Sequence, residues 1–280
     1  MNTIKILLEI GRRLLVIALL TLLTQVGGLI YLLYIPLSLQ LNKRIQPRFK
    51  RFMAKLGSFL TVYLLFSFLI IPTLASKISN RVPLPLFDHH VKPLHYGYVL
   101  LNRHYVKPQL KQIVLNVGER MDKAFPESII AYMDAGFPFW NGYPLLPHLS
   151  HDDGEKIDIA FFFKDKEGKE INRKTPTFLG YGSGFEPQKG ERDRPAECAK
   201  QGAWQYNWMH NNLPRFPWRD YELDKARSKK MIQLFARNKA IEKILIEPHM
   251  EQRLGMTQYG KLRMVGCKAV RHDDHIHVQL

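Results

Sequence analysis

The chain contains 280 residues, with 41 Lys and Arg against 25 Asp and Glu, and its formal net charge is +16. Residues 1–81 hold 11 basic side chains and one acidic side chain, a net of +10, whereas residues 82–280 hold 30 against 24, a net of +6. Most of the excess basic charge therefore precedes residue 82. We expect no nucleic-acid partner, because such a partner requires a concentrated basic face on the folded part.

Two long uncharged runs lie within the first 80 residues. Residues 14–42 carry no charge, and residues 56–76 form a second uncharged run. A helix rises about 1.5 Å per residue, so each run is long enough to cross a hydrocarbon core of about 30 Å. We therefore predict a two-helix transmembrane hairpin over residues 1–80, with spans at about 14–37 and 56–76. A cleaved signal peptide and a helical pair buried in a soluble core are the alternatives.

The loop between the two predicted spans, residues 43–55, is basic and contains no acidic residue. The positive-inside rule places such a loop in the cytoplasm, although Lys5, Arg12 and Arg13 before the first run compete with it. The rest of the chain then lies on the opposite side of the membrane, and membrane lipid is an expected partner. The basic residues of the loop are Lys43, Arg44, Arg48, Lys50, Arg51 and Lys55.

The remainder of the chain predicts short strands and a few helices. Residues 81–125 indicate a linker and then a packed helix, because apolar residues recur at helical spacing between residues 105 and 124. Residues 220–238 predict a second helix, and residues 164–170 predict a hairpin turn. For residues 126–280 we predict an α+β domain with a small, mainly antiparallel sheet and flanking helices. Its strands are predicted within residues 127–134, 156–163, 243–250, 261–267 and 275–280.

Two clusters of histidine and aspartate stand out in this predicted domain. In SHDDGEKIDIAFFF, a sharp bend at Gly154 followed by a strand would bring His151 and Asp158 to one ion. In RHDDHIHVQL, His275 and His277 alternate along a strand and therefore share a face. Two imidazoles and a carboxylate are a common catalytic zinc set, since three ligands leave a position for water. The alternative for the second cluster is a pair of hydrogen-bonded surface histidines.

These clusters resemble the LAS-type peptidoglycan zinc metallopeptidases, and most closely their penicillin-insensitive murein endopeptidase branch. The family pattern is a His, six residues and an Asp, and then a terminal His-x-His, matched here by His151, Asp158, His275 and His277. The resemblance covers about residues 126–280 and implies a Hedgehog/DD-peptidase-like fold. It also implies one zinc per chain, bound by His151, Asp158 and His277. The branch motif further matches His272, Asp273 and Asp274, with Ile276 at an aromatic place.

The resemblance implies a membrane-anchored peptidase that hydrolyses amide bonds in peptidoglycan cross-link or stem peptides. Its location is then the bacterial cytoplasmic membrane, with the catalytic domain on the periplasmic or extracellular side, where a membrane cell-wall complex is a further candidate partner. His275 lies near the metal-bound water and His272 lines the site. Asp274 competes with His275 as the base, because carboxypeptidase relatives carry a glutamate in its place. A non-catalytic zinc-containing module that binds cell wall or a partner is the alternative function.

Several other residues are weaker candidates for substrate contacts. Arg271 and Arg253 are expected to meet substrate carboxylates, and the resemblance brings His249 close to the metal. Trp204 begins an aromatic stretch that either walls a groove or packs under a loop. The glycine- and charge-rich segment 181–198 is either a lid or a surface excursion.

Both cysteines of the chain, Cys198 and Cys267, lie in the domain placed outside the membrane. An oxidising compartment permits a disulfide between them, and we predict this pairing. It would tie the insertion at residues 181–218 to the strand that carries the terminal histidines. Two buried free thiols are the alternative.

Overall fold

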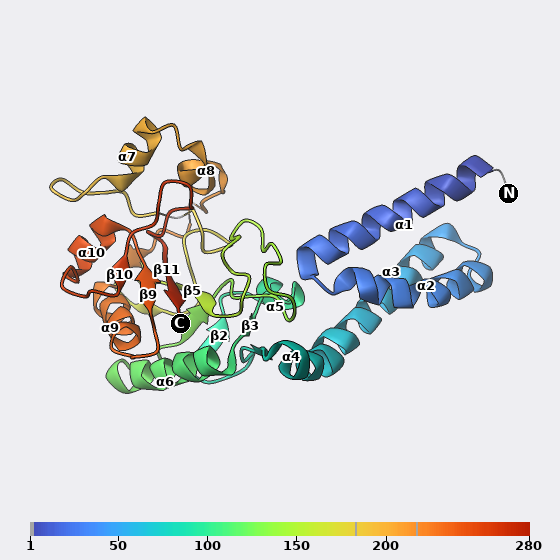
Figure 1. The fold of residues 1–280 in the computed structure, drawn as a ribbon, viewed down its shortest axis with the longest axis horizontal. Coiled ribbons are helices and arrows are strands. Elements are labelled where there is room, and N and C mark those ends of the chain that lie inside the picture. The colour runs from blue at the N-terminus through green and yellow to red at the C-terminus, as the bar shows by residue number, and fades with distance from the viewer. Residues whose placement is uncertain (1–2, 183, 217) are drawn as a thin grey trace.

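The chain folds into an N-terminal helical arm and a C-terminal α+β part in the computed structural model (Figure 1). The structure describes residues 3–182, 184–216 and 218–280. The arm, drawn in blue in Figure 1, extends away from the α+β part, and the C-terminus lies near the middle of the latter.

The arm consists of α1 (Thr3–Thr24), α2 (Gly27–Arg44) and one long continuous helix. This helix is formed by α3 (Arg48–Leu65), a π-helical turn and α4 (Ile71–Ser79). Within the described residues, one helix is long and apolar enough to cross a membrane, and it is Arg48–Ser79. It contains the second predicted span.

The first predicted span, residues 14–37, is wrong as a single helix. The chain reverses at Gln25, which has a φ of 64°, and α2 then runs back along α1. Two glycines permit this close return, because a Cβ on Gly27 would lie 2.5 Å from Oγ1 of Thr24 and one on Gly28 would lie 1.9 Å from Oγ1 of Thr21. Hydropathy did not reveal the reversal because the segments before and after the turn are both apolar.

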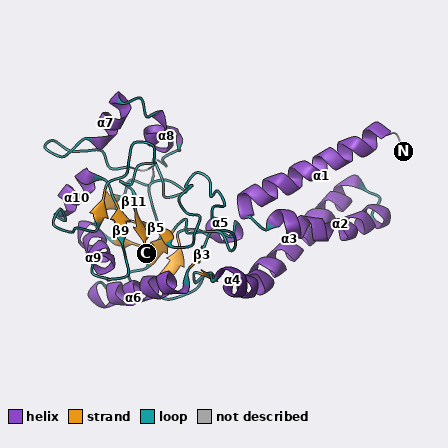
Figure 2. Cartoon of the chain, viewed as in Figure 1, coloured by secondary structure: helices purple, strands orange, loops and turns teal. Residues whose placement is uncertain are grey.

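The helices of the α+β part flank its strands, as Figure 2 shows by colour. The two predicted helices are confirmed as α6 (Pro108–Ala124) and α9 (Lys225–Ala236). The segment predicted as a strand at 243–250 is a strand only in its first half, because Pro248 begins a helix there. The other elements are β1 (Val82–Pro83), β2 (Val91–Pro93), α5 (Gly97–Leu100), β3 (Tyr105–Val106), β4 (Ile130–Tyr132), β5 (Lys156–Ala160), β6 (Phe163–Lys164), β7 (Glu170–Ile171), α7 (Arg194–Lys200), α8 (Trp204–Asn212), β8 (Glu222–Leu223), β9 (Lys243–Leu245), α10 (Pro248–Leu254), β10 (Leu262–Arg263) and β11 (His275–Gln279).

A mixed sheet with the strand order β10-β9-β11-β5-β4-β2 forms the centre of the α+β part. The central pairs, β9 with β11, β11 with β5 and β5 with β4, are antiparallel. The outer pairs, β10 with β9 and β2 with β4, are parallel. The predicted α+β class is confirmed. Smaller sheets, β1-β3 and β7-β6-β8, lie beside it, and the second contains the predicted hairpin turn between β6 and β7.

Side chains alternate between the two faces of the central strands. Ile157 and Ile159 of β5, and Ile276 and Val278 of β11, belong to one buried apolar cluster with residues of α6 and α9. The intervening side chains of β5 and β11 project to the opposite face, because successive residues of a strand point to opposite sides. That opposite face lies on the side of α7 and α8 and carries the candidate site.

Candidate metal centre

The pairing of β5 with β11 brings a carboxylate and an imidazole together. In the strand register His277 lies opposite Asp158, and Nδ1 of His277 is 3.0 Å from Oδ1 of Asp158. Both side chains are buried. His275 is two residues from His277 on β11 and therefore projects from the same face.

His151 reaches the same place from the loop before β5. This loop turns at Gly154, where φ is +80° and a Cβ would lie 3.0 Å from Nε of Arg81. Nδ1 of His151 donates a hydrogen bond to the carbonyl oxygen of Ala135 at 2.7 Å. This bond leaves Nε2 facing Asp158, 3.2 Å from Oδ1.

These three side chains form a group that can hold a metal ion. One ligand atom from each of His151, Asp158 and His277 lies within 4.8 Å of the others, and all three residues are buried. Two imidazoles and one carboxylate match the donors that zinc takes in catalytic sites. The structure therefore brings together the ligand set that the sequence predicted.

A second buried carboxylate, Asp134, lies behind Asp158. The hydroxyl of Tyr181 links them, because it donates to Oδ2 of Asp158 at 2.8 Å and lies 3.3 Å from Oδ2 of Asp134. Arg103 forms an ion pair with Asp134 at 2.6 Å, and Nδ1 of His148 donates to Asp134 at 3.0 Å. These contacts fix the orientation of Asp158, and partners of this kind hold metal ligands in place.

Burial and nearby charge shift the pKa values of Asp158 and His277 in ways that suit a cation, whereas the burial of His151 is outweighed by the charge of Asp158, which raises the pKa of His151. Burial raises the pKa of Asp158, but the imidazoles of His151 and His275 outweigh burial and hold it well below its usual value. Burial lowers the pKa of His277 to about 4. Asp158 is therefore ionised and His277 neutral near pH 7, and these are the forms that bind a metal ion.

Asp274 and His275, the rival candidates for the base, are in contact. Nδ1 of His275 donates to Oδ1 of Asp274 at 2.5 Å, while its Nε2 lies 3.8 Å from Oδ2 of Asp158. Across the described chain, Nε2 of His275 is a buried nitrogen without a hydrogen-bond partner. Burial lowers the pKa of His275, but the charges of Asp158 and Asp274 outweigh burial and raise it. Asp274 therefore orients the ring of His275, and Nε2 of His275 is directed toward Asp158.

A cavity of about 860 Å³ opens onto the ligand group. His151 and His277 lie in its lining, together with His148 and His272. Nδ1 of His272 donates to the carbonyl oxygen of Val270 at 2.9 Å. His272 thus occupies the lining position that the resemblance implied.

The walls of this cavity come mainly from residues 147–151, from α8 and from residues 265–270. Trp204 and Trp208 lie one turn apart on α8, and both line the cavity while 73% and 47% exposed. Such exposed aromatic rings at a cavity are suited to contacts with a ligand. Trp204 is therefore at the site.

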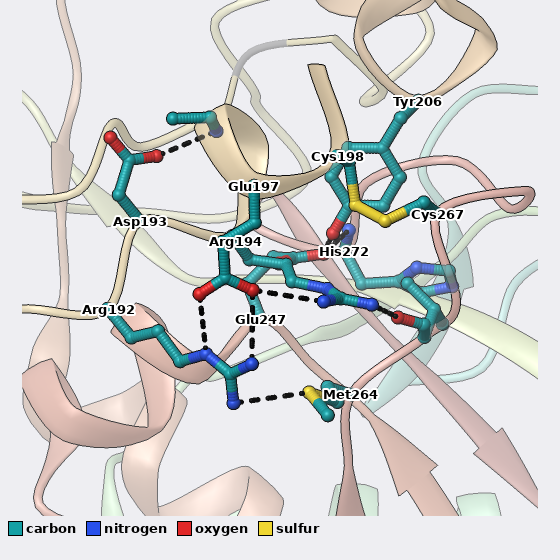
Figure 3. The surroundings of a disulfide bond; sticks show 12 residues. Arg192, Asp193, Arg194, Glu197, Cys198, Tyr206, Glu247, Met264, Cys267 and His272 are labelled. Carbon is teal, nitrogen blue, oxygen red and sulfur yellow. Dashed lines mark hydrogen bonds and ion pairs between the residues drawn. A yellow bond between two sulfur atoms is a disulfide. The ribbon is translucent and has the colours of Figure 1, made fainter. Parts of the chain in front are cut away.

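Cys198 of α7 and Cys267 form the predicted disulfide, with an S–S distance of 2.02 Å (Figure 3). Because α8 follows α7 closely and residues 265–270 contain Cys267, this bond connects two of the walls of the cavity. Below the disulfide, the hydroxyl of Tyr206 donates to Glu247 at 2.6 Å. Burial raises the pKa of Glu247.

The two arginines expected to meet substrate contact the protein's own carboxylates. Nε of Arg253 lies 3.0 Å from Oε1 of Glu191. Arg271 forms ion pairs with Asp273 and Glu186. Neither arginine lines the cavity. The structure does not bring them to the site, because each is already neutralised elsewhere.

His249 and the segment 181–198 also lie away from the cavity. His249 is buried, and its Nε2 donates to the carbonyl oxygen of Phe185 at 2.7 Å. The backbone N–H of Arg192 donates to Gln252 of α10 at 2.9 Å. None of the residues of this segment that the structure describes lines the cavity. Its first residue, Tyr181, contacts Asp158 from behind the ligand group, and Arg192 contacts α10.

The residues behind the ligands were the ones that sequence reasoning missed. Asp134 ends a predicted strand, and a carboxylate at the end of a strand could have indicated a residue near the site. Arg103 and Tyr181 lie 31 and 47 residues from Asp134, so no local spacing connects them to it. A comparison with protein-family models finds no match to this chain, and a comparison with curated proteins finds none either.

Proposed function

We propose that this protein is a membrane-anchored, zinc-dependent peptidase that hydrolyses amide bonds in the peptides of bacterial peptidoglycan. The observation that carries the proposal is the buried group of His151, Asp158 and His277 beside an open cavity. A structural zinc site is closed by four protein ligands, whereas three ligands leave a position for water. The resemblance of the two histidine clusters to LAS-type peptidases supports the choice of substrate.

In this proposal, each residue around the ligands has its own role in amide hydrolysis. Bound zinc supplies a Lewis acid, which polarises the scissile carbonyl and lowers the pKa of a water molecule. His275 accepts the proton of that water at Nε2 and returns it to the leaving amine. Asp274 keeps the other ring nitrogen of His275 protonated, and so leaves Nε2 as the base. His272 lines the cavity and contacts the reacting peptide.

The cavity suits an extended peptide that carries a carboxylate. Trp204 and Trp208 provide a broad apolar wall. Lys268 lies in the same lining and is exposed. Its ammonium group takes the role that the sequence suggested for Arg253 and Arg271, since a stem peptide ends in a carboxylate.

The helical arm supports the proposed membrane location. In this proposal the part of the helix Arg48–Ser79 that follows residue 55 crosses the bilayer, and the basic residues 43–55 remain in the cytoplasm. The α+β part then lies on the periplasmic or extracellular side. The disulfide between Cys198 and Cys267 agrees with this location, because such bonds persist in oxidising compartments.

The test uses the full chain purified with zinc in detergent. We expect one zinc per chain and new peptide products from purified peptidoglycan, measured by mass spectrometry. His277→Ala loses both zinc and products, whereas His275→Ala keeps zinc and loses products. His89→Ala, which removes an exposed histidine, keeps both. Bound zinc without products from any peptidoglycan preparation would favour a non-catalytic module that binds the wall or a partner protein.

A further inference from the structure

A buried arginine joins the end of the membrane helix to the loop of metal ligands. Arg81 lies two residues beyond α4 and is fully buried. Its guanidinium donates to the carbonyl oxygens of Phe137 at 2.5 Å and Asp152 at 2.8 Å. Asp152 adjoins the ligand His151. The metal centre therefore lies near the level at which the chain leaves the membrane helix.

Residues 137–143 lie directly against the helical arm. The backbone N–H of Phe139 donates to Oε1 of Gln25 at 2.7 Å. The hydroxyl of Tyr143 donates to the carbonyl oxygen of Thr21, also at 2.7 Å. This segment therefore forms part of the surface that the α+β part turns toward the arm, and toward any bilayer that the arm crosses (Figure 1).

A second cavity, of about 510 Å³, lies at this junction. Lys77 and Asn80 line it from the end of the membrane helix, Lys107 lines it from the start of α6, and Trp140 and Asn141 complete it. Within residues 3–182, 184–216 and 218–280, neither lysine forms an ion pair with a carboxylate. Trp140 is 62% exposed.

These groups suit the headgroup of an anionic phospholipid. The ammonium groups of Lys77 and Lys107 complement a phosphate, because opposite charges a few ångströms apart attract each other. The ring of Trp140 favours the boundary between headgroups and acyl chains. Ile78, which is 69% exposed and also lines the cavity, offers an apolar surface to an acyl chain. A soluble phosphate would use the lysines but would leave Trp140 and Ile78 in water.

We propose that the cavity bounded by Lys77, Lys107 and Trp140 binds the phosphate headgroup of an anionic phospholipid. The lipid belongs to the leaflet that faces the α+β part, and the inference rests on the proposed membrane location of Arg48–Ser79. The bound headgroup fixes residues 137–143, and with them the ligand loop, at the bilayer surface. The proposed peptide substrate then belongs to the peptidoglycan that lies next to that surface.

The test uses the full chain in nanodiscs that contain phosphatidylglycerol and phosphatidylcholine. After exchange into detergent, native mass spectrometry measures the phosphatidylglycerol that stays bound. We expect retention by wild type and a loss of about tenfold or more in the double variant Lys77→Gln/Lys107→Gln. The control is Lys123→Gln/Lys230→Gln, which alters another lysine pair that lines a cavity at the far end of α6. This control retains the lipid.

A second measurement places Trp140 in the bilayer. Lipids brominated close to the headgroup should quench part of the tryptophan fluorescence, and Trp140→Phe should remove that part. Trp204→Phe should retain it, because α8 lies away from the arm. Equal lipid retention by both double variants, or equal quenching in Trp140→Phe, would overturn the headgroup site. Extraction of the protein by alkaline carbonate would instead overturn the membrane location, so the two failures are distinguishable.

Discussion

The two faces of the β5–β11 pair are both buried, but they hold side chains of opposite character. One face carries aliphatic side chains that pack with α6 and α9, and the other carries the ligand group. Asp158 and Ile159 are neighbours in sequence, yet one belongs to the metal centre and the other to the core. The difference predicts that metal binding and folding stability depend on alternate residues of the same strands. Single substitutions at adjacent positions should therefore separate the two properties.

The largest expected effect is the loss of metal binding in His277→Ala. We expect zinc affinity to fall by more than the roughly 10- to 100-fold that is typical of removing a residue that only supports a ligand. The fold should persist, because the aliphatic face is unchanged. Competition with a chromogenic chelator measures the affinity, and circular dichroism measures the fold. Wild-type affinity in this variant would exclude His277 from the ligand set.

A substitution on the opposite face should have the opposite result: lower stability with unchanged zinc affinity. We expect Ile159→Ala to lower the free energy of unfolding by about 2–5 kcal/mol, because it leaves a cavity in the buried cluster. The zinc affinity of the folded protein should not change. Denaturant unfolding measures the first quantity and zinc titration the second. Ile276→Val is a milder control that should cost only about 0.5–1.5 kcal/mol, and a large loss of zinc affinity in either variant would show that the faces are not independent.

Tyr181→Phe tests the groups that hold the ligands. It removes the hydroxyl that donates to Asp158 but keeps the buried ring. We expect zinc affinity to fall about 10- to 100-fold with little change in thermal stability. Tyr98→Phe is the matched control, since Tyr98 belongs to the same buried cluster and donates to the carbonyl oxygen of Leu179. If both variants bind zinc equally well, the hydroxyl of Tyr181 does not orient Asp158.

His104 shows what burial does to an imidazole outside the metal centre. Burial, together with the nearby charge of Lys111, lowers its pKa to about 3. Below the unfolded pKa of about 6.5, the unfolded chain binds a proton that the folded chain does not. The free energy of unfolding therefore decreases as the pH falls from about 6.5 toward 3. The slope is at most about 1.4 kcal/mol per pH unit.

The variant His104→Gln should remove this part of the pH dependence. We expect the free energy of unfolding to change less between about pH 6 and pH 4 in the variant than in the wild type. Unfolding at several pH values in one detergent measures both slopes. Equal slopes would mean that His104 titrates alike in the folded and unfolded chains.

The two halves of the ligand group could be predicted because their signals are local in sequence, whereas their meeting at one ion was what the family resemblance implied. Alternation along one strand places His275 and His277 on one face, and a glycine turn brings His151 to Asp158. These features depend on backbone geometry over a few residues. The hairpin at residues 164–170 and the helices α6 and α9 were predictable for the same reason.

The contacts that hold the ligands were not predictable, because they join distant parts of the chain. The ion pair between Arg103 and Asp134 and the hydrogen bond from Tyr181 to Asp158 depend on tertiary packing. Arg253 appeared free in the sequence, but Glu191 neutralises it from 62 residues away. The reversal at Gln25 was overlooked because hydropathy averages over side chains and does not register a backbone turn.

The buried Arg81 would also limit how far from the bilayer the proposed peptidase can act. A flexible linker of about 30 residues would have a root-mean-square end-to-end distance of roughly 30 Å, and a domain on it could move over that distance. Arg81 instead donates hydrogen bonds to Phe137, Asn141 and Asp152 just beyond the end of the helix Arg48–Ser79. These bonds oppose rotation of the α+β part relative to that helix. If Arg48–Ser79 crosses a bilayer, as proposed, the fold fixes the distance between the ligand group and the bilayer surface. Under the proposed function, polymer strands beyond that distance would escape hydrolysis.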